Sequence, residues 1–128
     1  MNNLKLSMIA LPFFLMIPGL GYAVDTVQQV KFVSAGVGDD DPLLATKKDY
    51  NLHLLFAKKG SGEYLADVNV SVQDAAGSTV VSTMAGGPLF FARLPPGNYR
   101  ISVEFEGKPL GKSVSLGRNE SKDLYFYW

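Results

Sequence analysis

The sequence predicts an all-β sandwich, and three observations lead to this prediction. About seven short runs alternate between apolar and polar residues, the period of two that is typical of a half-buried strand. Clusters of glycine, proline, aspartate, asparagine and serine separate these runs at intervals of about 8–12 residues. Cysteine is absent, so a hydrophobic core rather than disulfides must hold the fold together. Two antiparallel sheets packed face to face are expected, because each strand has one apolar face to bury.

The first 23 residues have the composition of a secretory signal peptide. Lys5 is the only charge before an apolar run over residues 6–17, and small residues lead to a cleavage site after Ala23. The alternative is a retained membrane anchor, which needs about 20 apolar residues, whereas this run is shorter and is interrupted by Pro12 and Pro18. The mature protein is therefore expected in the periplasm or outside the cell, without a membrane span.

The charge balance argues against nucleic acid as a partner. Removal of the signal peptide leaves 11 basic and 12 acidic side chains, and no basic cluster is denser than the pairs Lys47–Lys48 and Lys58–Lys59. Non-specific binding to nucleic acid depends on neutralising several phosphates. We therefore expect no nucleic-acid interface.

Residues 24–48 are expected to form an N-terminal arm that carries a short helix. The first part of the arm could start as a strand but has no strong period. A helix is then predicted to begin at Pro42, with Asp41 as its N-cap and the acidic run 39–41 at the positive end of the helix dipole. Calcium binding is the weaker explanation of these aspartates, because a calcium loop needs a longer, regularly spaced set of oxygen ligands.

The sandwich domain is expected over residues 49–128. In YNLHLLFA, residues 50, 52, 54 and 56 share one face, and Asn51, His53 and Leu55 share the other. The later strands are expected in LADVNVSVQD, STVVSTM, LFFARL, NYRISVEF, KSVSLG and KDLYFYW. DAAG is predicted to close a hairpin, and EGKPLG and RNES to form turns.

The stretch LPPGNYRISVEF predicts a structural motif rather than a binding motif. Two prolines and a glycine turn the chain immediately before an alternating strand that begins with Tyr99. A tyrosine at this place can direct its hydroxyl to the upstream backbone, which is the tyrosine corner that fixes Greek-key connections in sandwiches. The alternative, a polyproline ligand, would need a longer proline-rich segment. The residues assigned to the corner are Leu94, Pro96, Gly97 and Tyr99.

Residues 50–128 resemble the carboxypeptidase regulatory-like family, whose members are seven-stranded sandwiches of transthyretin-like (prealbumin-like) or Cna-B-like type. The shared pattern is V-x-V-x-D-x-x-G, a turn, an apolar strand and L-x-P-G-x-Y. It falls here on Val70, Val72, Asp74, Gly77, Leu94, Pro96, Gly97 and Tyr99. The chain also resembles small exported bacterial proteins of this type. The resemblance implies a seven-stranded Greek-key sandwich with a binding or assembly role, and it names no ligand.

Catalysis is not expected from the residue types present. There is one histidine, His53, and on the more polar face of its strand it is expected to be a surface residue. A zinc site needs three or four ligands, and no serine lies in a Gly-x-Ser-x-Gly elbow. We therefore predict a non-enzyme with no catalytic, metal or cofactor-binding residue. A hydrolase that uses His53 is kept as an alternative.

The Cna-B resemblance implies one further covalent possibility. Some such domains form an internal isopeptide bond between an early lysine and a late asparagine or aspartate. Here Lys58 or Lys59 could pair with Asn119 or Asp123. This alternative stays open at the level of sequence.

The last strand, in LYFYW, is the best candidate for binding. Either its even or its odd residues fill the core, and in both cases aromatic side chains project from both faces. We take Tyr125 and Tyr127 as the candidate binding surface, because exposed aromatic rows pack on protein partners or stack on sugar rings. The predicted function is non-catalytic binding or assembly of a cell-envelope protein, and the alternative is binding of an envelope glycan.

Overall fold

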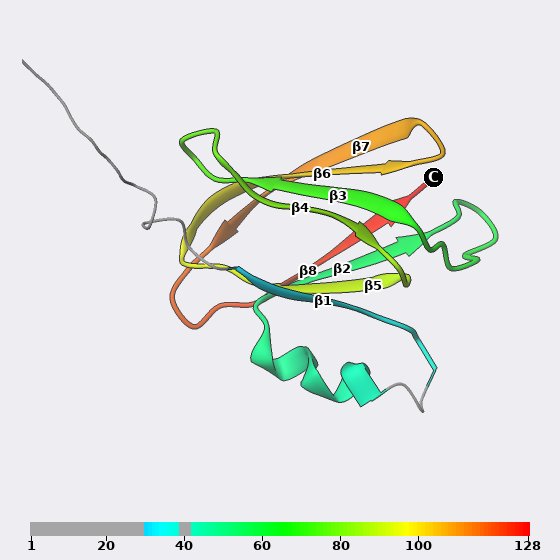
Figure 1. Ribbon diagram of the computed structural model, residues 1–128, viewed down its shortest axis with the longest axis horizontal. Coiled ribbons are helices and arrows are strands. Elements are labelled where there is room, and N and C mark those ends of the chain that lie inside the picture. Colours follow the sequence, from blue (N-terminus) through cyan, green and yellow to red (C-terminus); the bar gives the residue numbers. More distant parts are fainter. Residues whose placement is uncertain (1–29, 39–41) are drawn as a thin grey trace, which may run out of the picture.

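The computed structural model describes residues 30–38 and 42–128, in which eight β-strands form two four-stranded sheets packed face to face (Figure 1). The all-β prediction is confirmed, whereas the count of seven strands is wrong. Sheet A has the strand order β1-β5-β2-β8 and sheet B the order β4-β3-β6-β7. The strands are β1 (Lys31–Ala35), β2 (Leu52–Ala57), β3 (Val68–Gln73), β4 (Thr79–Ala85), β5 (Leu89–Arg93), β6 (Gly97–Phe105), β7 (Lys108–Leu116) and β8 (Lys122–Tyr127). The expected signal peptide lies outside the described residues.

The additional strand is β1, which comes from the segment expected to be an N-terminal arm. It pairs antiparallel with β5 along its whole length, from Lys31 opposite Arg93 to Ala35 opposite Leu89. Its sequence has no clear period because β1 is an edge strand whose side chains are mostly exposed or half-buried. Phe32 lies on its inner face, 44% exposed, and stacks on Phe90 with ring centroids 5.6 Å apart. Sheet A thus includes a strand from before residue 49.

The core between the sheets follows the predicted alternation. Val68, Val70 and Val72 of β3 are buried, and the residues between them face solvent or are half-buried. In β6 the buried residues are Tyr99, Ile101 and Val103. Burial of such side chains stabilises the fold by about 1.5–3 kcal/mol each, as an upper estimate. The period of two therefore decides which face of these strands packs inward.

The expectation of purely antiparallel sheets is wrong for one pair of strands. β8 pairs in parallel with β2, from Leu52 beside Lys122 to Ala57 beside Tyr127. The other pairings between the named strands are antiparallel. Parallel neighbours need a long connection, and here the chain runs through all of sheet B between β2 and β8. This pairing depends on contacts far apart in the sequence.

Two turns set the register of sheet B. The predicted hairpin at Asp74–Gly77 is confirmed: the Asp74 carboxylate accepts hydrogen bonds from the backbone N–H groups of Ala76 at 3.0 Å and Ser78 at 2.9 Å. The turn expected over EGKPLG is shorter than predicted. Only Glu106 and Gly107, with φ of 50° and 79°, separate β6 from β7. Both residues have the positive φ of a tight hairpin turn of type I′, so residues 108–111 extend β7.

Tyr99 joins the start of β6 to the turn before it. Its hydroxyl donates a hydrogen bond of 2.6 Å to the backbone carbonyl of Pro95, four residues upstream, and its side chain is buried. Burial, and then the negative charge of Asp74, raise the pKa of Tyr99 above its ordinary value of 10.0. Leu94 is buried at the same connection. The side-chain amide of Asn51 accepts a hydrogen bond from the Leu94 N–H at 2.8 Å and donates one to the Leu94 carbonyl at 2.7 Å.

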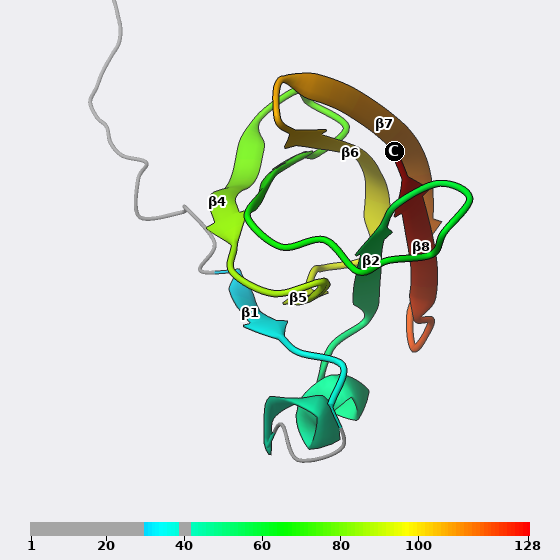
Figure 2. The same cartoon turned by 90° about the vertical axis from the view of Figure 1, so that its right-hand side faces the viewer.

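A short helix covers part of the outer face of sheet A. This is the 3₁₀ helix η3 (Pro42–Asp49), which Figure 2 shows below the sheet, on the side away from sheet B. The N-cap predicted at Asp41 lies outside the described residues. Phe91 of β5 faces this cover and is fully buried, with the ring of Tyr50 at 6.0 Å. Within residues 30–38 and 42–128, no helix has both the length and the apolar character to cross a membrane.

Candidate functional site

The outer face of sheet A changes in character from one end to the other. The residues of β2 and β8 that face outward pair as His53 with Asp123, Leu55 with Tyr125, and Ala57 with Tyr127. One end is therefore polar and lies beside η3, and the other end is aromatic. The two ends offer different chemistry and are described in turn.

The aromatic end contains both residues of the predicted binding surface. Tyr125 and Tyr127 are 46% and 49% exposed, and the intervening Phe126 is buried in the core. The structure therefore selects one of the two alternatives for the last strand, with the tyrosines facing outward. They are two residues apart on one strand, which separates their Cα atoms by about 7 Å.

A third tyrosine, not identified from the sequence, joins this end of the sheet. Tyr64 forms an isolated antiparallel bridge with Ala57, the residue that pairs with Tyr127, and is 52% exposed. Ala57 is 2% exposed although it faces outward between the two tyrosines. We call Tyr64, Tyr125 and Tyr127 the tyrosine surface. Tyr64 was missed because it follows a glycine-rich loop, and only its pairing with Ala57 places it across β2 from Tyr127.

The strand that carries two of these tyrosines is held firmly at its end. The Trp128 backbone N–H donates to Ala57 O at 3.1 Å, and its indole Nε1–H donates to Lys108 O of sheet B at 2.8 Å. The indole ring also lies 6.2–6.4 Å from Phe56 and Phe126. Trp128 thus links the two sheets beside the tyrosine surface, so the tyrosines project from a fixed backbone.

The outer face of sheet B provides a contrast. Ser82, Ser71, Ser102 and Gly111 lie side by side across its four strands in one row. The one large exposed apolar side chain on this face in the described structure is Met84, at 57%. Small polar side chains are the ordinary occupants of a solvated sheet face. The exposed aromatic residues of sheet A are therefore a local feature and not a general property of the surface.

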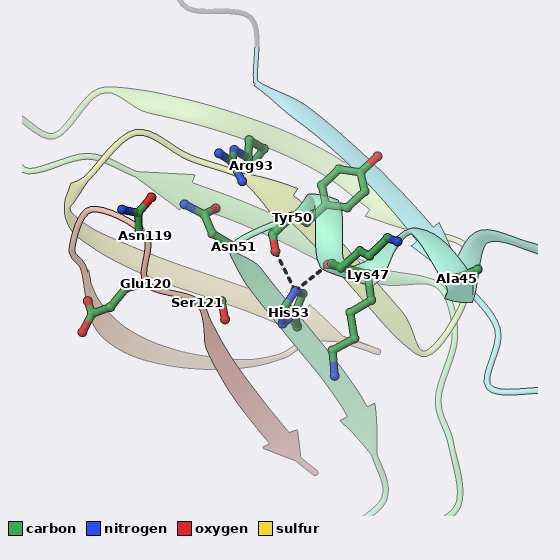
Figure 3. A pocket seen from close by; sticks show the side chains of 10 residues that line it. Ala45, Lys47, Tyr50, Asn51, His53, Arg93, Asn119, Glu120 and Ser121 are labelled. Carbon is green, nitrogen blue, oxygen red and sulfur yellow. Dashed lines mark hydrogen bonds between the residues drawn. The ribbon is translucent and has the colours of Figure 1, made fainter.

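At the polar end, His53 is buried rather than exposed as expected. It is 8% exposed because η3 and Tyr50 cover it, and its ring meets Phe91 edge-on at 5.3 Å. Its Nδ1 lies 2.6 Å from the Asp123 carboxylate. Its Nε2 lies 3.0 Å from Lys47 O and 2.9 Å from Tyr50 O, the two contacts drawn as dashed lines in Figure 3. The cover of the outer face depends on packing between distant segments, which the period of β2 does not reveal.

These contacts occupy both ring nitrogens of His53. Carbonyl oxygens only accept, so Nε2 must carry a proton that it shares between Lys47 O and Tyr50 O. Nδ1 is engaged by the Asp123 carboxylate. Lys47 Nζ is 3.9 Å from the same Asp123 oxygen. His53 therefore connects η3 to β8, and neither ring nitrogen has capacity left for a substrate or for a serine hydroxyl.

The described residues also bear on a metal site and on the isopeptide alternative. No group of three or more histidine, cysteine, aspartate or glutamate side chains could hold a metal ion in residues 30–38 and 42–128. The isopeptide pairing is not brought together. Lys59 lies beside Trp128, at the end of β8 opposite to Asp123, which lies beside His53. Asn119 precedes β8, so it lies even farther from Lys59 than Asp123 does.

No known family model matches this chain, and a search of characterised proteins also finds no match.

Proposed function

We propose that this protein is a non-catalytic, exported β-sandwich module that binds, or helps to assemble, a protein partner of the cell envelope. The observation that carries the proposal is the tyrosine surface on the outer face of sheet A. Three tyrosines that are 46–52% exposed lie there on the two sides of β2, Tyr64 on one side and Tyr125 and Tyr127 of β8 on the other. Tyrosine is enriched at protein interfaces, because it combines a large apolar ring with a hydroxyl that forms hydrogen bonds.

The fixed backbone beneath these side chains favours binding. β8 pairs with β2 along its whole length, and Trp128 links it to sheet B. A partner that docks on the tyrosine surface orders only the side chains and not the backbone, which lowers the entropic cost of association. The absence of free ring nitrogens at His53 supports a binding role over the alternative of a hydrolase.

We further propose that the sandwich is of the carboxypeptidase regulatory-like, transthyretin-like type with Greek-key connections, and that β1 is added to the seven strands of that family. The motif positions support this assignment: Val70 and Val72 are core residues, and Asp74 closes a hairpin. Tyr99 donates its hydroxyl to Pro95 O as a tyrosine corner does. With residues 1–23 as a cleaved signal peptide, the protein would act in the periplasm or outside the cell.

A second candidate is binding of an envelope glycan. The observation that favours it is that the same outer face carries polar groups at its other end, where Asn119 and Ser121 line a hollow together with Tyr50. Aromatic rings that flank polar groups are suited to stacking on sugar rings and to bonding their hydroxyls. The aromatic and polar ends are separate, however, and this makes a protein partner the better-supported proposal.

The test is affinity purification of the full chain from its native host after crosslinking in living cells. Three forms are compared: wild type, the double variant Tyr125→Ser/Tyr127→Ser, and the control variant Met84→Ser. Met84 is a matched control because it is as exposed as the tyrosines but lies on the other sheet.

One envelope protein that is recovered with wild type and Met84→Ser, and lost with the double tyrosine variant, would support the proposal and identify the partner. Equal recovery with all three forms would move the interface away from the tyrosine surface. If no protein is recovered and the wild type binds an envelope polysaccharide in a Tyr125-dependent way, the glycan candidate replaces the proposal.

A further inference from the structure

A basic hollow lies at the polar end of sheet A, separate from the tyrosine surface. It has a volume of about 650 Å³ and is bounded by the end of η3, the start of β2, the end of β5 and the loop before β8. Figure 3 shows Asn119, Glu120 and Ser121 on one side, Lys47 and Tyr50 on the other, and Arg93 above His53. We call Lys47, Lys48, Arg93, Asn119 and Ser121 the basic hollow.

The charges that line the hollow do not balance. Three of the lining side chains are cationic, Lys47, Lys48 and Arg93, and one is anionic, Glu120. Glu120 is already engaged, because its carboxylate accepts a hydrogen bond of 2.6 Å from the N–H of Gly117. The Asp123 carboxylate, beside His53 at the floor, is paired with Lys47. The lining therefore has an excess of positive charge.

Two of these cations have no carboxylate partner in the described structure. The ion pairs found in residues 30–38 and 42–128 are those of Asp123 with Lys47 and with His53. Lys48 and Arg93 are in neither. A second depression that shares Asn51, Arg93 and Asn119 with the hollow is also lined by Arg118, which extends the positive region. Cations that gather in a concave site attract an anion more strongly than isolated surface charges do.

The walls of the hollow are held in place from behind. Asn51 uses both ends of its side-chain amide on Leu94, which fixes the start of β2 to the end of β5 near Arg93. The loop before β8 is closed by hydrogen bonds between Glu120 and Gly117, through backbone and side chain alike. The side chains of Asn119 and Ser121 form no hydrogen bond with the described residues, so they are free to donate to a ligand.

We propose that the basic hollow binds an anionic group, a carboxylate or a phosphate, carried by a ligand of the envelope. The guanidinium of Arg93 supplies two parallel N–H donors, which match the paired oxygens of such a group. Lys48 adds a mobile positive charge, and Asn119 and Ser121 add neutral donors on the opposite side. The hollow is larger than one anionic group requires, so it has room for part of the molecule that carries the group. This site is independent of the tyrosine surface and does not depend on a protein partner there.

The experiment is an NMR titration of the full chain with sodium phosphate and, separately, with sodium acetate, at constant ionic strength maintained with sodium chloride. Saturable shifts of the backbone amides of Arg93, Asn119 and Ser121 are expected, with dissociation constants in the range of about 1–10 mM for such small probes. Stronger binding of phosphate would indicate a phosphate-bearing ligand, and stronger binding of acetate a carboxylate-bearing one. Shifts that grow linearly with both probes, without saturation, would overturn the proposal.

Paired variants decide whether the hollow itself is responsible. Lys48→Gln/Arg93→Gln removes the two unpaired charges and is expected to weaken binding by about tenfold or more. Lys58→Gln/Lys59→Gln removes the same charge from the opposite end of the sheet and should leave binding unchanged. All four side chains are exposed, so both variants are expected to fold. Equal weakening by the two variants would show a general charge effect and would contradict a site in the hollow.

Discussion

Replacement of Tyr99 by phenylalanine removes a single hydroxyl from the junction between the two sheets. That hydroxyl donates to Pro95 O at 2.6 Å, and the ring that carries it is buried. A hydrogen bond of this kind contributes about 0.5–1.5 kcal/mol net. Since Pro95 is exposed, its carbonyl can be rehydrated in the variant, which limits the loss to about 1 kcal/mol. For a domain of about 100 residues, this corresponds to a fall in Tm of about 4–8 °C.

The same substitution should change how the free energy of unfolding depends on pH in the alkaline range. Burial, and secondly the charge of Asp74, raise the pKa of Tyr99 above 10.0 in the folded state. The folded protein therefore holds this proton more tightly than the unfolded chain does. The contribution of the phenol to stability is complete below about pH 10 and is lost as the pH rises through the folded-state pKa. Tyr99→Phe lacks this titration, so the stability difference between wild type and variant should narrow above about pH 10.

The assay is equilibrium urea unfolding at about pH 7 and at several pH values between about 9 and 11. Tyr125→Phe is the control, because Tyr125 is 46% exposed and its hydroxyl has no hydrogen-bond partner in the described structure. The control should unfold like wild type at every pH. The stabilising role of the Tyr99 hydroxyl is contradicted if Tyr99→Phe unfolds at the same urea concentration as wild type at pH 7, or if the difference in stability stays constant above about pH 10.

Three further substitutions test other parts of the structure. His53→Phe removes the Nε2–H that donates to Lys47 O and Tyr50 O, so the free energy of unfolding should fall by about 2–3 kcal/mol. Amide hydrogen exchange in η3 should become faster, and unchanged exchange would contradict the connection between His53 and η3. Asn51→Ala leaves the backbone N–H and carbonyl of Leu94 without their partner, so the free energy of unfolding in urea should fall by about 2 kcal/mol. A fall within experimental error would refute the role of Asn51 in holding Leu94. Lys112 points inward on the edge strand β7, with its Nζ 5.4 Å from the centre of the Phe126 ring. Lys112→Leu should promote self-association, measured by sedimentation velocity, because an inward charge protects a sheet edge from pairing; a variant that stays as monodisperse as wild type would show that the edge needs no such protection.

The elements that sequence reasoning predicted are those with a local cause. The valines of β3 alternate, and they are buried as the period requires. Asp74 and Gly77 form a hairpin because a carboxylate can bond the turn backbone and glycine tolerates its φ of 86°. Tyr99 follows a proline–glycine turn, and its hydroxyl is found at the upstream carbonyl.

The features that were missed depend on contacts between distant segments. His53 is on the more polar face of its strand, but η3 and Tyr50 cover that face, and Asp123 lies beside it across a parallel pairing. Tyr64 joins the candidate site through one bridge to Ala57. The period of a strand indicates that two faces differ, but it does not show what packs on the second face. The residues that line the hollow likewise come from η3, the start of β2, the end of β5 and the loop before β8, which only the fold brings together.

The central claim is that the tyrosine surface is the face that meets a protein partner. The most direct measurement places a photocrosslinking amino acid at position 125, and in a second strain at position 102 in the serine row of sheet B, in full chains expressed in living cells. The structure predicts one dominant protein adduct from position 125 and none from position 102, since both positions are exposed but on opposite faces. An adduct from position 102 alone, or the same adducts from both positions, would contradict the claim.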